Sequence, residues 1–103
     1  MANLRFLPAA REDTFVIYSW YEQKTKGLGE DFLRIFYSKA ADIPQNPFLY
    51  SEIHGSFRRC LLKRFPYAVY FRVQSEEVIV FGVFHCMREP GAIAALLGKR
   101  EKS

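Results

Sequence analysis

The segment Val78–Phe84 constrains the fold most, because none of its positions carries a polar or charged side chain. A strand with one face toward solvent alternates polar and apolar residues, so this run predicts a strand that is buried on both faces. The chain has 103 residues, which is the length of one small domain. A domain of this size therefore has to find cover for both sides of its central strand.

Two helices are expected before the strands. Residues Leu4–Leu7 form a short apolar stretch that ends at Pro8, and this predicts a strand followed by a helix. Apolar residues recur at helical spacing over Ala9–Lys24 and again over Leu28–Ile43. Because only a few residues separate the two patterns, we expect the helices to pack as an antiparallel hairpin.

The second half of the chain predicts a sheet and a terminal helix. Arg58–Lys63, Ala68–Val73 and the apolar segment above are rich in β-branched and aromatic residues, which predicts three antiparallel strands in a meander. Ala92–Leu97 predicts a short helix capped by Gly98, with residues 99–103 frayed behind it. The expected fold is one α+β domain over residues 1–103, in the order β-α-α-β-β-β-α. An antiparallel sheet packs on an N-terminal helical hairpin, and a short C-terminal helix follows.

This layout leaves the cover of the central strand incomplete. A helical hairpin shields only one face of a sheet, and the predicted terminal helix Ala92–Leu97, with six residues, is small for the other face. We therefore expect a partner chain to complete the second face. The alternative is that the terminal helix folds back and is sufficient.

Several protein classes are excluded. The apolar runs are far shorter than the roughly 20 residues that cross a bilayer, and the N-terminus lacks the pattern of a secretion signal. Cys60 and Cys86 are outside any metal-ligand or C-x-x-C spacing, which favours free thiols in a reducing compartment. We expect a cytoplasmic protein with no membrane partner, no metal and no cofactor.

Positive charge is concentrated in one predicted hairpin. The net charge is +4, yet the segment Phe57–Arg72 holds five cations and no acid. Such a surface, interleaved with aromatic residues, can hold phosphates and stack bases, or it can dock an acidic protein segment. Alternatively, the charges only keep an exposed sheet edge from aggregating. The five cations are Arg58, Arg59, Lys63, Arg64 and Arg72.

Candidate catalytic groups are sparse. His85 ends the last predicted strand, three residues before Arg88. A general acid or base with a cation that stabilises phosphate charge could be built from this pair. The sequence shows no nucleophile with a recognisable partner, no Gly-rich phosphate loop and no paired carboxylates. A structural hydrogen bond is the simpler role for a histidine at a strand end.

Five motifs together resemble the RelE/ParE superfamily of type II toxin–antitoxin toxins, which includes plasmid-stabilisation proteins. The matching pieces are FLPAAREDTFVIYSWYE, GLGEDFL, IPQNPFLY, RRCLLKRFPYAVYF and VIVFGVFHCMREP, and they span nearly the whole chain. The order and spacing of these pieces, especially FPYAVYF followed by FHCMREP, identify the superfamily.

The resemblance implies one of two functions. RelE-like members are ribosome-dependent ribonucleases that cut messenger RNA with basic residues on the sheet and a Tyr on the terminal helix. ParE-like members keep the fold and poison DNA gyrase. In this chain the position of the catalytic Tyr is Ala94, which can neither activate a ribose hydroxyl nor protonate a leaving oxygen. We therefore expect a ParE-like toxin rather than an enzyme, with a RelE-like mRNA endonuclease as the alternative. A basic binding module without toxicity is a third hypothesis.

The resemblance also implies a partner and site residues. The expected partner is a cognate ParD-like antitoxin with an acidic C-terminal segment, and the expected target is DNA gyrase; direct nucleic-acid binding is not favoured. Antitoxin binding is expected at Arg58, Lys63, Arg64, Tyr67, Tyr70, Phe71, Arg72 and Arg88. Target binding is expected at His85, Arg88, Ile93, Leu96 and Leu97. If the chain were RelE-like, catalysis would fall to Lys63, Arg64, His85 and Arg88.

Overall fold

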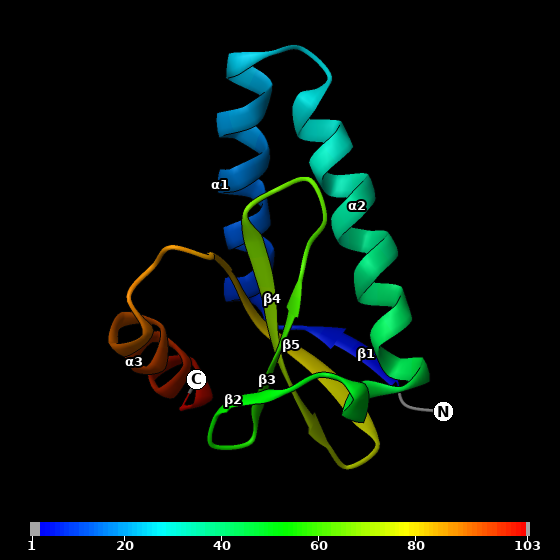
Figure 1. Ribbon diagram of the computed structural model, residues 1–103, viewed down its shortest axis with the longest axis vertical. Coiled ribbons are helices and arrows are strands. Elements are labelled where there is room, and N and C mark those ends of the chain that lie inside the picture. Colours follow the sequence, from blue (N-terminus) through cyan, green and yellow to red (C-terminus); the bar gives the residue numbers. More distant parts are fainter. Residues whose placement is uncertain (1–2, 103) are drawn as a thin grey trace.

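The computed structural model describes residues 3–102, and its elements follow the predicted order with one added strand (Figure 1). The predicted helices, α1 and α2, stand side by side as an antiparallel hairpin. Two short 3₁₀ turns separate that hairpin from the strands, and α3 ends the described chain. The elements are β1 (Asn3–Phe6), α1 (Pro8–Lys24), α2 (Leu28–Asp42), β2 (Glu52–His54), β3 (Phe57–Leu61), β4 (Tyr67–Gln74), β5 (Glu77–His85) and α3 (Pro90–Glu101).

The sheet is mixed. Its strand order is β1-β5-β4-β3-β2, and β3, β4 and β5 form the predicted antiparallel meander. β1 lies parallel to β5, with Leu4 opposite Val78 and Phe6 opposite Val80. This pairing follows from the hairpin connections, because β4 occupies one edge of β5 and leaves the other free for the N-terminal strand. The three-residue edge strand β2 was not predicted; its residues are all exposed, so it has no apolar pattern.

The helical hairpin covers one face of the sheet. Its turn depends on Gly29, where an added Cβ would lie 2.5 Å from the carbonyl oxygen of Tyr18. The Glu22 carboxylate accepts hydrogen bonds of 2.9 Å from the backbone N–H groups of Gly27 and Gly29. Phe32 and Phe36 of α2 are fully buried against the apolar side chains of this sheet face. The hairpin therefore forms the larger of two cores.

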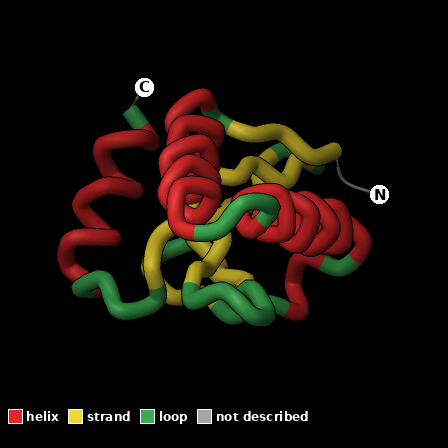
Figure 2. Tube along the Cα trace, turned by 90° about the horizontal axis from the view of Figure 1, so that it is seen from above, coloured by secondary structure: helices red, strands yellow, loops and turns green. Residues whose placement is uncertain are grey.

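Helix α3 covers the opposite face, away from the hairpin (Figure 2). Ile79, Phe81 and Phe84 of β5 are at most 3% exposed beneath it. The expectation that β5 is buried on both sides is confirmed, but a partner chain is not needed to bury it. The prediction underestimated α3, since its twelve residues give three turns of cover.

The end of α3 also differs from the prediction. Gly98 lies inside the helix rather than at its cap, and residues 99–101 continue the helix instead of fraying. Two side chains of this stretch explain the difference: Arg100 binds Asp13 of α1, and Glu101 forms an ion pair with Arg72 of β4. Ser103 lies outside the described residues.

Candidate functional site

Two grooves flank the loop between β5 and α3, and Met87 and Arg88 line both of them. The first, here called the α1 groove, lies between α1 and the end of β5 and has a volume of about 520 Å³. It is lined by Asp13, Val16, Ile17, Tyr67, Val83, Phe84, His85, Met87 and Arg88. A neighbouring cavity continues it along α1 past Trp20, Tyr21 and Pro66.

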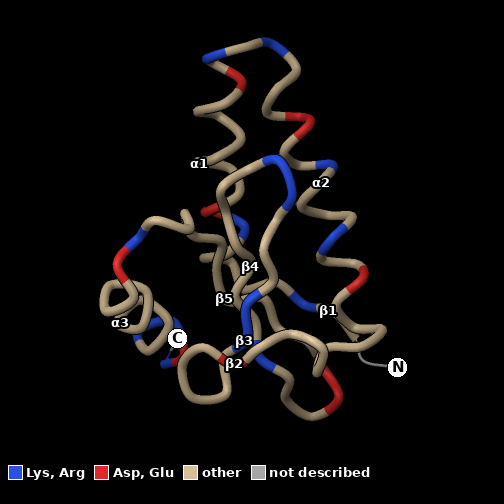
Figure 3. The backbone as a smooth tube through the Cα atoms, viewed as in Figure 1, with Lys and Arg blue, Asp and Glu red and all other residues tan. Residues whose placement is uncertain are grey.

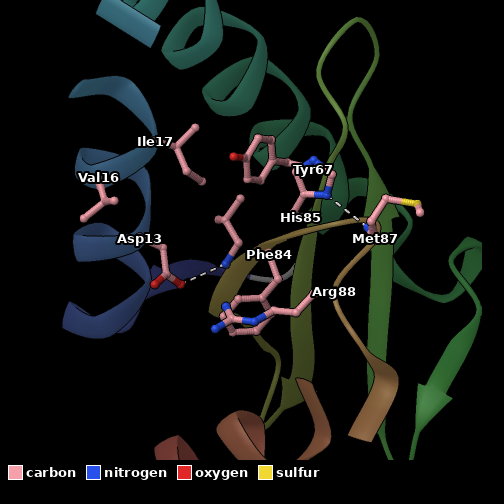
Figure 4. A pocket seen from close by; sticks show the side chains of 9 residues that line it. Asp13, Val16, Ile17, Tyr67, Phe84, His85, Met87 and Arg88 are labelled. Atoms are coloured by element: carbon pink, nitrogen blue, oxygen red, sulfur yellow. Dashed lines mark hydrogen bonds between the residues drawn. The ribbon is translucent and has the colours of Figure 1, made fainter. Parts of the chain in front are cut away.

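The polar groups of the α1 groove are held in place by hydrogen bonds (Figure 4). Asp13 accepts a 3.0 Å hydrogen bond from the backbone N–H of Val83. His85 Nδ1 accepts one of 3.0 Å from the backbone N–H of Met87, and its ring meets the Tyr67 ring edge-on at 5.1 Å. His85 thus makes the structural hydrogen bond that was the simpler of its two expected roles. Burial raises the pKa of the Tyr67 phenol above its ordinary value.

Large apolar side chains along the α1 groove remain exposed. Val16 is 59% exposed, Trp20 is 54% exposed and Met87 is 84% exposed. Val16 and Trp20 are four residues apart on α1, so they lie on one helix face. Neither was among the predicted site residues, because an apolar side chain at helical spacing is more typical of a core position. An exposed apolar patch beside a groove is typical of a protein-binding surface.

The second groove, here called the α3 groove, has a volume of about 470 Å³ and opens between β2, β3 and the start of α3. Its cations are Arg59 and Arg88, and both are exposed. Ala94, which the resemblance places at the catalytic Tyr position, lines this groove. The full lining is Ile53, His54, Arg59, Tyr70, Cys86, Met87, Arg88, Pro90, Ile93 and Ala94.

The cations of the β3–β4 hairpin do not form one continuous basic surface. Arg58 forms an ion pair with Glu52, Arg64 with Asp31 and Arg72 with Glu101. Arg58 also donates to the Tyr50 carbonyl oxygen, and Arg72 lies over the rings of Phe57 and Phe81. Basic and acidic residues are distributed over the whole backbone (Figure 3). Carboxylates from outside the hairpin therefore pair with three of the five cations that the sequence concentrates there.

Four residues expected to bind partners lie in the core. Tyr70 and Phe71 are at most 1% exposed, and Leu97 is fully buried. Ile93 is 6% exposed and packs with Leu97 against the sheet. These side chains stabilise the α3 face and the hairpin face, so in this conformation they cannot reach a partner. Alternation along a strand and periodicity along a helix mark core positions as readily as binding positions.

The remaining expected residues stay at the surface. Lys63 and Arg64 are exposed at the turn between β3 and β4, and Leu96 is half-buried on α3. Arg64 has a positive φ of 74° in this turn. Lys63 and Arg64 lie in neither groove, whereas His85 and Arg88 meet in the α1 groove. The set expected for a RelE-like enzyme is therefore not brought together in one groove.

Within residues 3–102, no group of three His, Cys, Asp or Glu side chains is arranged to hold a metal ion. None of the helices in that part of the chain is long and apolar enough to span a membrane. The thiols of Cys60 and Cys86 are both free, the first buried and the second exposed.

Comparison with known proteins gives a consistent result. A family model described as the ParE toxin of the type II toxin–antitoxin system parDE matches residues 4–90. Toxin ParE2 from two strains of Mycobacterium tuberculosis is 26% identical over 99 residues, which cover 95% of this chain and 94% of the relative. A solved structure of the chromosomal ParDE TA system from P. aeruginosa superposes with a TM-score of 0.74 at 20% identity, covering 82% of this chain and 96% of that one.

Proposed function

Because the chain belongs to the family of ParE toxins of type II toxin–antitoxin systems, we propose that it inhibits DNA gyrase and that a cognate antitoxin neutralises it. The observation that carries this proposal is the match to the ParE family over residues 4–90, together with Ala94 in the α3 groove. A ribonuclease of the RelE type would need a proton-transfer group at that position. The gyrase proposal therefore takes precedence over mRNA cleavage.

The α1 groove is the proposed docking site of the antitoxin. Val16 and Met87 in this groove, and Trp20 in the cavity that continues it, offer exposed apolar surface that a bound antitoxin segment can bury. Arg88 at its end can pair with a carboxylate of an acidic segment. Lys63 and Arg64 remain candidates for weaker, peripheral contacts, because they are exposed at the β3–β4 turn.

The target surface is proposed to include His85, Arg88 and Leu96, which are the members of the expected target set that reach the surface. Arg88 is shared between this surface and the antitoxin groove. Antitoxin binding would then cover a target contact directly, and this would explain neutralisation without any change of fold.

The test is to add purified protein to a gyrase supercoiling assay and, in parallel, to a translation extract in which mRNA cleavage is followed. We expect loss of supercoiling and intact mRNA. Intact supercoiling with mRNA cut at the ribosome would reject the gyrase proposal in favour of the endonuclease. Inactivity in both assays, with tight binding to an acidic partner, would indicate a binding module without toxicity.

The docking site is tested with Trp20→Ala. Removal of this indole should weaken antitoxin binding roughly ten- to a hundred-fold, as expected for an aromatic anchor, while gyrase inhibition stays unchanged. The matched control is Phe15→Ala, because Phe15 is 64% exposed on the same helix but lines neither the α1 groove nor the cavity that continues it past Trp20. If both variants weakened antitoxin binding equally, the antitoxin would have to bind elsewhere on α1.

A further inference from the structure

We propose that the outer face of α1 pairs with the same face of a second copy of this chain, as two antiparallel helices related by a two-fold axis. The residues of this face recur at intervals of three and four positions, so they lie on one side of the helix. The pairing does not depend on gyrase being the target. The outer face of α1 consists of Glu12, Phe15, Val16, Ser19, Trp20, Gln23 and Lys24.

The apolar part of this face is only partly accounted for by the grooves. Phe15 is 64% exposed, Val16 is 59% exposed and Trp20 is 54% exposed. Val16 lines the α1 groove and Trp20 lines the cavity that continues it, but Phe15 lines neither of them and is absent from the α3 groove as well. Three large apolar side chains on one stretch of helix are typical of a surface that binds protein.

The charges of the face indicate which protein it fits. Glu12 lies near the start of α1 and Lys24 is its last residue, and neither forms an ion pair within residues 3–102. An antiparallel pair brings Glu12 of each copy close to Lys24 of the other. A parallel pair would instead place like charges side by side. The face is therefore complementary to itself in the antiparallel orientation.

The order of the side chains between these charges fits the same pairing. In a two-fold pair, residues at equal distances from the axis face each other. An axis that passes between residues 17 and 18 places Phe15 opposite Trp20 of the second copy, and Val16 opposite its Ser19. The small Ser19 side chain lets the two helices approach, since the distance between packed helices depends on the side chains at the contact.

An acidic protein segment fits this face less well than a second copy does. The outer face carries one acid, Glu12, and one cation, Lys24, so it offers no net attraction to a negatively charged chain. The Lys24 ammonium also lies 5.0 Å above the Trp20 ring. Figure 1 shows that the turn of the helical hairpin extends past the β3–β4 turn, which leaves the end of α1 open to a second molecule.

The area of the face predicts a weak dimer. Aromatic side chains bury about 150–250 Å² each, so the exposed parts of Phe15 and Trp20 offer roughly 200–300 Å² per copy. A standard interface buries about 800 Å² per partner, and we therefore expect a Kd of about 10–100 μM. Because Trp20 also lines the cavity beside the α1 groove, self-pairing and antitoxin binding would exclude each other; this consequence alone rests on the proposed antitoxin site.

The first experiment is sedimentation equilibrium of the full chain, without antitoxin, from about 2 to 500 μM. The average mass should rise from that of one copy toward that of two. Phe15→Ser should weaken the pairing at least about ten-fold, because each dimer loses two aromatic rings. The matched control is Phe48→Ser, since Phe48 is 65% exposed but lies in a 3₁₀ turn far along the chain from α1. This control should change the Kd by less than about two-fold.

The second experiment exchanges the charges at low salt, where exposed ion pairs are least screened. Glu12→Lys and Lys24→Glu should each weaken the pairing about three-fold or more, and the double variant should return to within about two-fold of the original chain. Circular dichroism checks that each variant is folded, and the charge variants still test the pairing if Phe15→Ser unfolds.

Three results would overturn the proposal. A chain that stays monomeric over the whole concentration range does not pair. Equal losses from Phe15→Ser and Phe48→Ser would mean that association is non-specific. A double charge variant that fails to recover would exclude the antiparallel arrangement. None of these results bears on the supercoiling assay, so failure of the pairing and failure of the gyrase proposal are distinguishable.

Discussion

At the scale of single residues, Gly82 is fixed by its contacts rather than by its backbone angles. An added Cβ would lie 2.6 Å from Arg100 Nη1 and 2.6 Å from the Phe84 ring. Arg100 uses this space to donate a 2.9 Å hydrogen bond to the Phe81 carbonyl oxygen. We expect Gly82→Ala to lower the free energy of unfolding by about 1–3 kcal/mol, measured by urea denaturation.

The control for this substitution is Gly98→Ala. Gly98 lies within α3, and an added Cβ there meets no atom within 4 Å. Alanine in a helix interior is favoured over glycine by about 0.5–1 kcal/mol, so this variant should be more stable than the original chain. If the two glycines responded alike, the close approach of Arg100 would not be the reason for Gly82.

Asp31 gives a prediction on pH at the same scale. Hydrogen bonds from Arg34, and then from Arg64, hold the pKa of this carboxyl below its ordinary value. Because the pKa is lower in the folded state, the pairing contributes stability above an unfolded pKa of about 3.9. This contribution is lost as the pH falls through the folded pKa. The difference in Tm between the original chain and Asp31→Asn should therefore be small at pH 7 and shrink below about pH 4.

The comparison carboxylate for that pH series is Glu12. It is exposed on α1, and no cation pairs with it among the described residues. Glu12→Gln removes one exposed carboxylate that makes no ion pair among the described residues, so it is the control for the loss of a negative charge alone. A Tm difference for Asp31→Asn that grew on acidification would contradict the direction of the pKa shift.

At the scale of elements, one ion pair fastens α3 to the rest of the fold. Arg100 and Asp13 form two hydrogen bonds, of 2.6 and 3.0 Å, and both side chains are only 16% exposed. Asp13 also holds the N–H of Val83 on the edge of β5 that β1 no longer reaches. The pair therefore joins α1, β5 and α3 at one point. It replaces the backbone hydrogen bonds that a longer β1 would have made.

Arg100→Gln should release this junction. The variant leaves Asp13 with a largely buried charge and an incomplete set of hydrogen-bond donors, so we expect a loss of about 2–3 kcal/mol in unfolding free energy. Limited proteolysis should cut α3 faster in this variant, because the helix is then held only by its buried apolar side chains and by the Glu101–Arg72 ion pair. The control is Glu101→Gln, which weakens a more exposed pair with Arg72 and should cost less than about 1 kcal/mol. Equal costs would mean that Arg100 contributes no more than a surface charge.

At the scale of the whole molecule, local sequence patterns predicted the helices and strands but not how α3 packs on the sheet. The alternation of apolar residues along a strand and their periodicity along a helix depend only on residues close in sequence. For this reason α1, α2 and the meander β3–β5 could be predicted. The cover supplied by α3 depends on Arg100 meeting Asp13, a contact across 87 positions that no local pattern records. The same limit applies to charge, because Glu101 and Asp31 neutralise cations of the β3–β4 hairpin from distant elements.

The candidate site was predicted in part for the same reason. His85 and Arg88 could be singled out because they end a strand beside a loop. Trp20 was missed because an aromatic residue at helical spacing reads as core, and only the structure shows that its ring remains exposed. Arg59 could be recognised as a cation but not as unpaired, since the carboxylates that pair with its neighbours lie elsewhere in the chain.

The reactivity of the two thiols tests whether the whole fold opens as one cooperative unit. Cys60 is 1% exposed beneath the helical hairpin, and burial raises the pKa of its thiol, whereas Cys86 is exposed at the α3 groove. Because only the thiolate reacts, one equivalent of Ellman's reagent should be consumed rapidly in native buffer and two in denaturant.

The Cys86→Ser variant isolates Cys60 for a rate measurement. Its labelling requires the hairpin to open from the sheet, so the native rate should be at least about a thousand-fold below the rate in denaturant. Labelling of Cys60 should then slow or accelerate in step with global stability across the Gly82 and Arg100 variants. A native rate that is fast, and that stays unchanged when α3 is released, would mean that the two cores open independently. In that case the sheet would not couple the two helical layers into one cooperative unit.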